Sequence, residues 1–198
     1  MTTYGAAKGL IWVVSRLLWR VKAYGQENVP LTGPLIIAAN HRSNLDPPIL
    51  GAYCPRRISY MAKVELFAIP ILGAAIRSFG AYPVDRHGSS TAAIKRSVEV
   101  LRAGGCCGIF PEGGRNLDGE RQVHEGVALL ASLAKAPVVP AALIGTSRAR
   151  QFAAMKVVYG KPMRLPEGRK ATRDDLAKFT QEIMSAIAAL SESIGGNS

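Results

Sequence analysis

Apolar residues recur along the first part of the chain with the spacing of an amphipathic helix. They stand at i, i+3, i+4, i+7, i+8 and i+11, as Leu10, Val13, Val14, Leu17, Leu18 and Val21. Such residues share one helix face, and Trp12, Arg16 and Trp19 fall on the opposite side. Tryptophan with basic residues on one face is typical of a helix in a lipid interface. We therefore predict a membrane-interface helix at residues 1–22, with these three side chains contacting lipid. The alternative is that both tryptophans pack beneath the C-terminal helix or another subunit.

The rest of the chain, residues 23–194, alternates short apolar runs with amphipathic stretches. The runs predict strands at Pro34–Ala39, Ile58–Ala62, Ala81–Val84, Cys106–Phe110, Val138–Ile144 and Met155–Tyr159. The stretches between them predict helices that begin near Asp46 and cover Ile69–Ser78, Thr91–Arg102 and Glu125–Leu133, with a long closing helix opened by Thr172 or Asp174. Alternating strands and helices indicate a three-layer α/β domain with a largely parallel central sheet flanked by helices.

Composition and charge exclude some classes of protein and indicate the kind of partner that this chain binds. Hydrophobic residues make up 48% of the 198 residues, which is a globular balance and excludes a disordered chain. The 25 Lys and Arg against 14 Asp and Glu give a net charge of +11, which favours nucleic acid, an acidic membrane surface or a phosphate-bearing substrate. Three cysteines cannot all pair, which favours a reducing compartment. No apolar run reaches the roughly 20 residues of a transmembrane helix. We therefore predict a peripheral protein on the cytoplasmic face of the cell membrane.

Polar residues follow the predicted strands, where functional groups lie in domains of this kind. In the first such loop, His41 stands at a strand end and Asp46 at the start of the next helix. A loop that folds the two together lets the carboxylate fix the imidazole tautomer, and the other nitrogen is then free as a general base. Alternatively, Asp46 only caps its helix and His41 is a surface residue.

The loop after Ala81–Val84 carries Arg86 near a predicted helix start. Its guanidinium has the fork geometry that binds phosphate, and the backbone amides of a helix start favour anions. The alternative is a surface arginine paired with Asp85.

The loop after Cys106–Phe110 contains Glu112, Gly113 and Arg115. Glycine allows positive φ and a close approach of ligand to backbone. The carboxylate and the guanidinium are suited to a glycerol hydroxyl and a phosphate, and the alternative is a simple Gly-Gly turn.

Other catalytic patterns are missing from the sequence. It contains no HExxH, no Cys/His ligand spacing and no glycine-rich nucleotide loop, so we predict no metal site. Gly145–Ala149 lacks the second glycine of a nucleophile elbow, and Cys107 lies in an apolar strand where cysteine is usually a small hydrophobe. The strand Val138–Ile144 bears no reactive side chain and is interpreted as an apolar wall.

Four motifs in order resemble the glycerolipid acyltransferase family, best known for 1-acyl-glycerol-3-phosphate acyltransferases. They are His-x4-Asp, Gly-x4-Asp-Arg, Phe-Pro-Glu-Gly-x-Arg and Val-Pro, and the resemblance covers about Leu35 to Ile144, with Met61–Leu66 also similar. The resemblance implies transfer of an acyl group from acyl-CoA or acyl carrier protein to lysophosphatidic acid. It implies no cofactor and no acyl-enzyme.

The resemblance also implies roles for single residues. His41, oriented by Asp46, takes the proton of the acceptor hydroxyl as it attacks the thioester. The implied substrate-binding residues are Lys63, Arg86, Glu112, Gly113 and Arg115, with Asn40 or nearby amides at the oxyanion. The net charge of +11 suits a phosphate-bearing acceptor and an anionic membrane surface.

The chain departs from the family pattern at two places and leaves other functions open. Gly114 and Asn116 replace the usual Thr and Ser of the third motif, and Pro83-Val84 replaces an aromatic-Ile pair. These changes affect the identity of the acceptor, so glycerol 3-phosphate, a lysophospholipid or an ornithine-type lipid are alternatives. Two alternatives are not enzymes: a basic module that binds nucleic acid, and a membrane-docking protein without catalytic activity. With 7% aromatic residues and dispersed basic ones, we predict no nucleic-acid partner.

Overall fold

A single sheet forms the centre of the protein in the computed structural model, which describes residues 3–84, 90–116, 123–166 and 169–195. Within these residues the strands are β1 Lys22–Tyr24, β2 Leu35–Ala39, β3 Ile58–Lys63, β4 Ala81–Val84, β5 Cys106–Ile109, β6 Val138–Ile144 and β7 Lys156–Tyr159. They lie in the order β1-β7-β6-β2-β5-β3-β4. The neighbours among β6, β2, β5, β3 and β4 are all parallel. β7 runs antiparallel to β6, and β1 is parallel to β7, so the prediction of a largely parallel sheet is confirmed.

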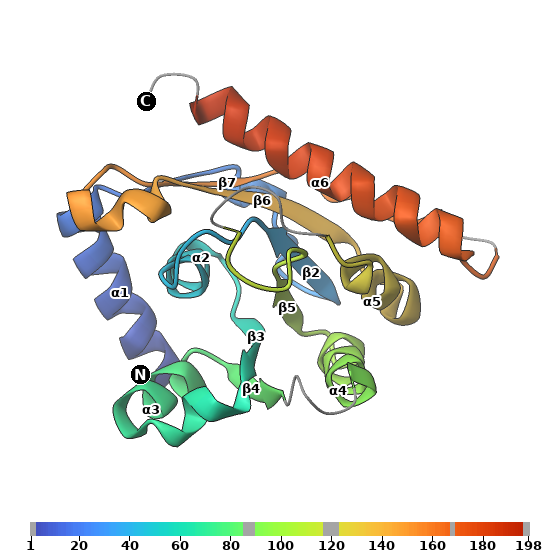
Figure 1. The fold of residues 1–198 in the computed structure, drawn as a ribbon, viewed down its shortest axis with the longest axis horizontal. Helices are drawn as coiled ribbons and strands as arrows, with labels where there is room; N and C mark the ends of the chain where they lie inside the picture. The colour runs from blue at the N-terminus through green and yellow to red at the C-terminus, as the bar shows by residue number, and fades with distance from the viewer. Residues whose placement is uncertain (1–2, 85–89, 117–122, 167–168, 196–198) are drawn as a thin grey trace.

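Helices cover both faces of the sheet and complete the three predicted layers (Figure 1). One side carries α1 Thr3–Trp19 and α2 Asp46–Tyr53, with α3 Pro70–Ser78 beside α1. The other carries α4 Ser90–Arg102, α5 Gly126–Ala134 and α6 Arg173–Gly195. Alternate residues of β2 serve the two cores: Leu35 and Ile37 join the core under α2, while Ile36 and Ala38 join the core under α5 and α6. Side chains buried on both faces explain why β2 reads as an unbroken apolar run.

Several short elements were not predicted. β1 has only three residues, and the 3-10 segments η1 Gln26–Asn28, η2 Val64–Ala68 and η3 Thr146–Gln151 carry no periodic pattern of their own. The long helix does begin as predicted, because the Thr172 hydroxyl accepts from the amide of Asp175 while the Asp175 carboxylate accepts from the amide of Thr172. This reciprocal pair is a capping box, which satisfies two amides at the start of α6.

The first helix presents its apolar side to solvent and packs its mixed side against the protein. Ser15 is 1% exposed and its hydroxyl lies 3.2 Å from that of Tyr53, and the Lys8 ammonium donates to the Cys54 carbonyl. The Trp19 indole donates to the Ala149 carbonyl at 2.8 Å, which favours internal packing for this tryptophan, against η3 and not the C-terminal helix. The apolar residues on the outer face are 38–76% exposed: Leu10, Val13, Val14, Leu17 and Leu18. We call these five residues the α1 apolar face.

None of the helices formed by the described residues has both the length and the apolarity that crossing a bilayer requires.

Candidate active site

The sheet order brings the predicted motifs together at one edge. β2, β5, β3 and β4 are parallel neighbours, so the loops that follow them leave the sheet at the same edge. His41 follows β2, Glu112 follows β5, and Lys63 ends β3 beside Val84 of β4. Arg86 follows β4 but lies outside the described residues. Groups that are far apart in sequence therefore share the carboxyl edge where α/β domains place their ligands.

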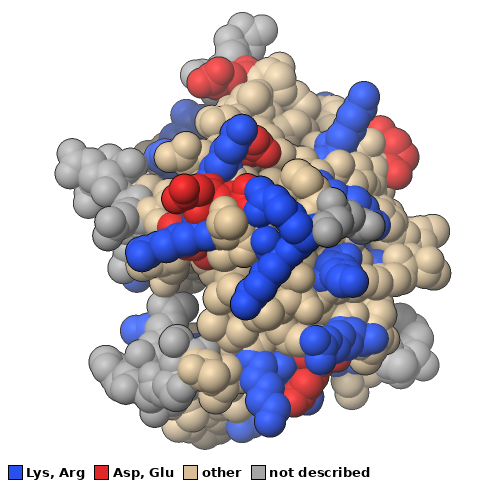
Figure 2. Space-filling view, turned by 90° about the vertical axis from the view of Figure 1, so that its right-hand side faces the viewer, with Lys and Arg blue, Asp and Glu red and all other residues tan. Residues whose placement is uncertain are grey.

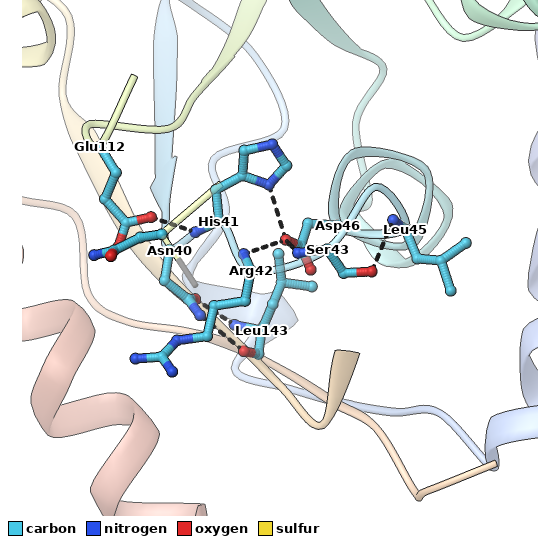
Figure 3. A network of polar contacts seen from close by, with 9 residues as sticks. Asn40, His41, Arg42, Ser43, Leu45, Asp46, Glu112 and Leu143 are labelled. Carbon is cyan, nitrogen blue, oxygen red and sulfur yellow. Dashed lines mark hydrogen bonds and ion pairs between the residues drawn. The ribbon is translucent and has the colours of Figure 1, made fainter. Parts of the chain in front are cut away.

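His41 and Asp46 form a hydrogen-bonded pair at this edge (Figure 3). The Asp46 Oδ2 atom lies 2.8 Å from His41 Nδ1 and also accepts from the backbone amides of Arg42 and Ser43 at 2.7 and 2.6 Å. Asp46 is 0% exposed. Its carboxylate makes no side-chain cap for α2, which begins at Asp46 itself. The alternative of a simple helix cap is thus wrong for Asp46, whose carboxylate holds the loop closed around the imidazole.

The His41 ring is held from a second side by Phe110. The two ring centroids are 4.3 Å apart with planes inclined at 26°. The His41 side chain keeps 15% of its surface exposed, so a ligand can reach it. Because the Nδ1–H group donates a hydrogen bond to the carboxylate, the neutral imidazole carries its lone pair on Nε2. The arrangement therefore presents one basic nitrogen in a fixed tautomer.

The third motif wraps around the backbone of His41. Glu112 is 5% exposed, and its Oε2 accepts from the His41 amide at 2.8 Å. Gly113 has a φ of +66°, and a Cβ built there would lie 2.8 Å from the His124 ring. Both facts favour glycine at position 113, because a positive φ and a close neighbour each penalise a side chain.

The Asn40 side chain is bound to β6. Its Oδ1 accepts from the Leu143 amide at 2.8 Å, and its Nδ2 donates to the Leu143 carbonyl at 2.9 Å (Figure 3). This pair extends the pairing of β2 with β6 by one residue. The geometry does not favour an oxyanion role for this amide. It fixes the residue before His41 to β6, the strand that also contains the fourth motif.

The basic residues of the site occupy exposed positions. Lys63 is exposed at the end of β3, and Arg115 is exposed on the loop after β5. β5 lies between β2 and β3, so the loop of Arg115 leaves the sheet between those of His41 and Lys63. A cation at each of these strand ends is suited to an anionic group bound beside the imidazole.

Two residues of the site were missed by sequence reasoning. Phe110 was predicted as a strand end and as the first residue of the third motif but was given no role, yet its ring stacks on His41. Asn116 was noted only as a departure, yet it is 8% exposed, donates its backbone amide to the His41 carbonyl at 2.7 Å, and donates its side-chain amide to Glu112 at 3.3 Å. Phe110 directly precedes the Pro-Glu-Gly turn and Asn116 follows the Arg115 of the same motif, and this position in the motif is the signal that could have identified them.

The cysteines do not supply a nucleophile. Cys107 is buried in β5, and burial raises the pKa of its thiol to about 12, so the thiol stays protonated and unreactive near neutral pH. In the ranges that the structure describes, no three His, Cys, Asp or Glu residues come together as metal ligands.

Comparisons with known proteins agree on one family. The family model described as Acyltransferase matches residues 20–144. The chain is 32% identical to the 1-acyl-sn-glycerol-3-phosphate acyltransferase of Bacillus subtilis over 90% of this chain and 92% of the relative. It is 29% identical to the protein of the same name from Streptococcus pneumoniae, over 96% of this chain and 73% of the relative.

A solved structure has the same fold. The crystal structure of the 1-acyl-sn-glycerophosphate acyltransferase from Thermotoga maritima matches with a TM-score of 0.73 and 22% identity, over 94% of this chain and 79% of that one. At this identity the likeness shows the fold.

Proposed function

This chain belongs to the acyltransferase family and is an O-acyltransferase; we propose that it acylates the free hydroxyl of 1-acyl-glycerol 3-phosphate and so forms phosphatidic acid. The acyl donor is a thioester, acyl-CoA or acyl carrier protein. The observation that carries the proposal is the 2.8 Å pair of His41 and buried Asp46, with one imidazole nitrogen left to take a proton. The names of the two bacterial relatives support lysophosphatidic acid as the acceptor.

The chemistry is direct transfer with His41 as general base. Nε2 takes the proton of the acceptor hydroxyl as the oxygen attacks the thioester carbonyl, because a free hydroxyl is too weak a nucleophile at neutral pH. Asp46 stabilises the imidazolium that forms. When the tetrahedral intermediate collapses, the C–S bond breaks and the imidazolium returns its proton to the leaving sulfur. The ester oxygen replaces the sulfur, and no acyl-enzyme forms.

The acceptor phosphate is assigned to the basic residues of the same edge. Lys63 and Arg115 leave the sheet beside the His41 loop, and the motif resemblance adds Arg86. Guanidinium groups bind phosphate through paired hydrogen bonds. Gly113 lets the backbone approach the ligand closely. Glu112 belongs to the same site, where its carboxylate accepts from the His41 amide.

The substrate is an amphiphile, and we assign the α1 apolar face to the surface of the membrane that contains it. Leu17 is 76% and Leu10 66% exposed, which is costly in water and favourable against acyl chains. Arg16 lies over the Trp12 ring at 5.5 Å, and both line a groove of about 340 Å³ with Lys8. Lys8 lies on the packed side of α1 and donates to the Cys54 carbonyl, so of these two cations only Arg16 is exposed and can attract an anionic lipid surface.

Positive charge is not confined to α1. On the face seen in Figure 2, which lies at the right-hand side of Figure 1, Lys and Arg side chains are spread over the surface with Asp and Glu among them. The net charge of +11 attracts the molecule to an anionic surface. We infer that the α1 apolar face sets the orientation. Cys54, Cys106 and Cys107 are free and buried, which supports the cytoplasmic face of the membrane as the location.

The test of the proposed function is acylation by the purified full chain with acyl-CoA and acyl carrier protein as donors. Lysophosphatidic acid, glycerol 3-phosphate and monoacylglycerol serve as parallel acceptors. We expect phosphatidic acid from the first, and at least roughly 10²-fold lower kcat/KM for monoacylglycerol, because the charge-assisted contacts of the site's basic residues to phosphate are lost. A preference for glycerol 3-phosphate would move the assignment to that acceptor. Transfer to none of the three would contradict the proposal.

The membrane assignment predicts the effect of substituting the α1 apolar face. Replacing Leu10, Val13 and Leu17 with Ser should weaken binding to phosphatidylglycerol-containing vesicles at least about 10-fold, because exposed side chains that enter lipid are lost. Vesicle sedimentation measures the effect. Leu133→Ser is the matched control, because this leucine is 45% exposed on α5 and should leave binding unchanged. Equal binding by the triple variant and wild type would refute the assignment.

A further inference from the structure

The backbone of His41 is held on both sides by one loop. Its amide donates to Glu112 Oε2 at 2.8 Å, and its carbonyl accepts from the Asn116 amide at 2.7 Å. The Asn116 side chain closes the ring by donating to Glu112 Oε1 at 3.3 Å. Figure 3 shows the Glu112 carboxylate directed at the His41 backbone, on the side away from the imidazole and Asp46. We call Glu112 and Asn116 the His41 brace.

Burying the polar side chains of the His41 brace costs desolvation free energy, which their hydrogen bonds must offset. Glu112 is 5% and Asn116 8% exposed, and a buried carboxylate is tolerated only where donors face it. Both oxygens of Glu112 have such donors within the protein. Its carboxylate is therefore engaged with the chain itself, whereas the motif resemblance implies that it holds the glycerol portion of the acceptor.

We propose that Glu112 and Asn116 are positioning residues, which fix the backbone of His41 so that its imidazole stays between Asp46 and Phe110. This inference rests on the proposed function, since it assigns the brace to the base of that reaction. Asn116 stands where the family pattern has Ser, and its longer side chain reaches Glu112. The substitution is thus part of the brace in this chain.

The brace also couples acceptor binding to the base. Arg115 lies between Glu112 and Asn116 in sequence, so the segment assigned to the acceptor phosphate is the segment that holds His41. A phosphate bound there and the imidazole then keep a fixed separation. Such positioning matters because a misplacement of about 1 Å can cost roughly 10²-fold in rate.

Kinetics of Glu112→Ala distinguish positioning from acceptor binding. We expect kcat to fall about 10- to 10²-fold while KM for lysophosphatidic acid stays within about 2-fold, because the base is displaced and the acceptor contacts remain. Arg115→Ala, in the same loop, should instead raise KM. Glu112→Gln keeps an oxygen for the His41 amide and should recover most of the lost kcat. Asn116→Ala keeps the backbone bond to the His41 carbonyl and should show a smaller loss of kcat than Glu112→Ala.

The outcomes separate failure of the brace from failure of the proposed function. Hydrogen exchange at the His41 amide should be faster in Glu112→Ala than in Arg115→Ala, and thermal unfolding shows whether either variant is misfolded. A raised KM with unchanged kcat in Glu112→Ala would overturn the brace and return Glu112 to acceptor binding. If Glu112→Ala is unfolded, a full loss of kcat in the folded Glu112→Gln variant would also overturn it. Wild-type protein inactive on every acceptor would instead remove the proposed function.

Discussion

His41→Ala should lower kcat/KM for the acylation of lysophosphatidic acid by about 10³-fold, because general bases contribute roughly 10²- to 10⁴-fold to such reactions. The ring is the only part removed, and its backbone partners Glu112 and Asn116 keep their bonds to the main-chain atoms of residue 41. The loop should therefore hold its shape. Release of the thiol from acyl-CoA in the presence of acceptor, followed continuously, measures the rate.

Added imidazole provides the matched control for this variant. The space between Asp46 and Phe110 accommodates the His41 ring, so free imidazole should enter it and restore part of the activity of His41→Ala. It should not stimulate wild type. Rescue shows that a base is missing and that the fold is intact. Activity of His41→Ala close to that of wild type would rule out His41 as the base, and the proposed mechanism with it.

The parts of the fold predicted well are those set by local pattern. β4 and β6 were predicted with their observed bounds. Apolar runs between turn signals specify strands, both for β6, which is buried in the sheet, and for β4, which lies half-buried at its edge. β1, with three residues, depends on pairing with β7, and no local pattern encodes such a partner. Contacts between residues far apart in sequence are hard to predict for this reason, because no local pattern names the partner.

In the candidate site too, the contacts that could be predicted are those between residues close in sequence. His41 and Asp46 lie five residues apart, so a short loop can bring them together and the sequence predicts the pair. Asn116 and His41 are far apart in sequence and meet only because β5 pairs with β2. For α1 the periodicity located both faces correctly, yet which face packs depended on partners such as Tyr53 and Ala149. Periodicity defines the faces of a helix, while the neighbouring elements decide which face is covered.

The second large effect is expected at Asp46. In Asp46→Asn the remaining side-chain oxygen can still accept from the amides of Arg42 and Ser43, and the new amide group replaces Oδ1, which has no hydrogen-bond partner among the described residues. The loop should close as before, while the charge that stabilises the imidazolium is gone. A charge-assisted hydrogen bond contributes about 1.5–3 kcal/mol, so kcat should fall roughly 10- to 10²-fold.

Asp46→Ala is the companion variant, because it removes the charge and the loop contacts together. It leaves the amides of Arg42 and Ser43 without the Oδ2 acceptor, at a cost of about 1–3 kcal/mol for each buried donor left unpaired. We therefore expect a lower melting temperature for Asp46→Ala than for Asp46→Asn, with a larger fall in kcat. If Asp46→Asn kept wild-type kcat while Asp46→Ala lost it, Asp46 would act through the loop alone. The carboxylate charge would then have no part in the proton transfer.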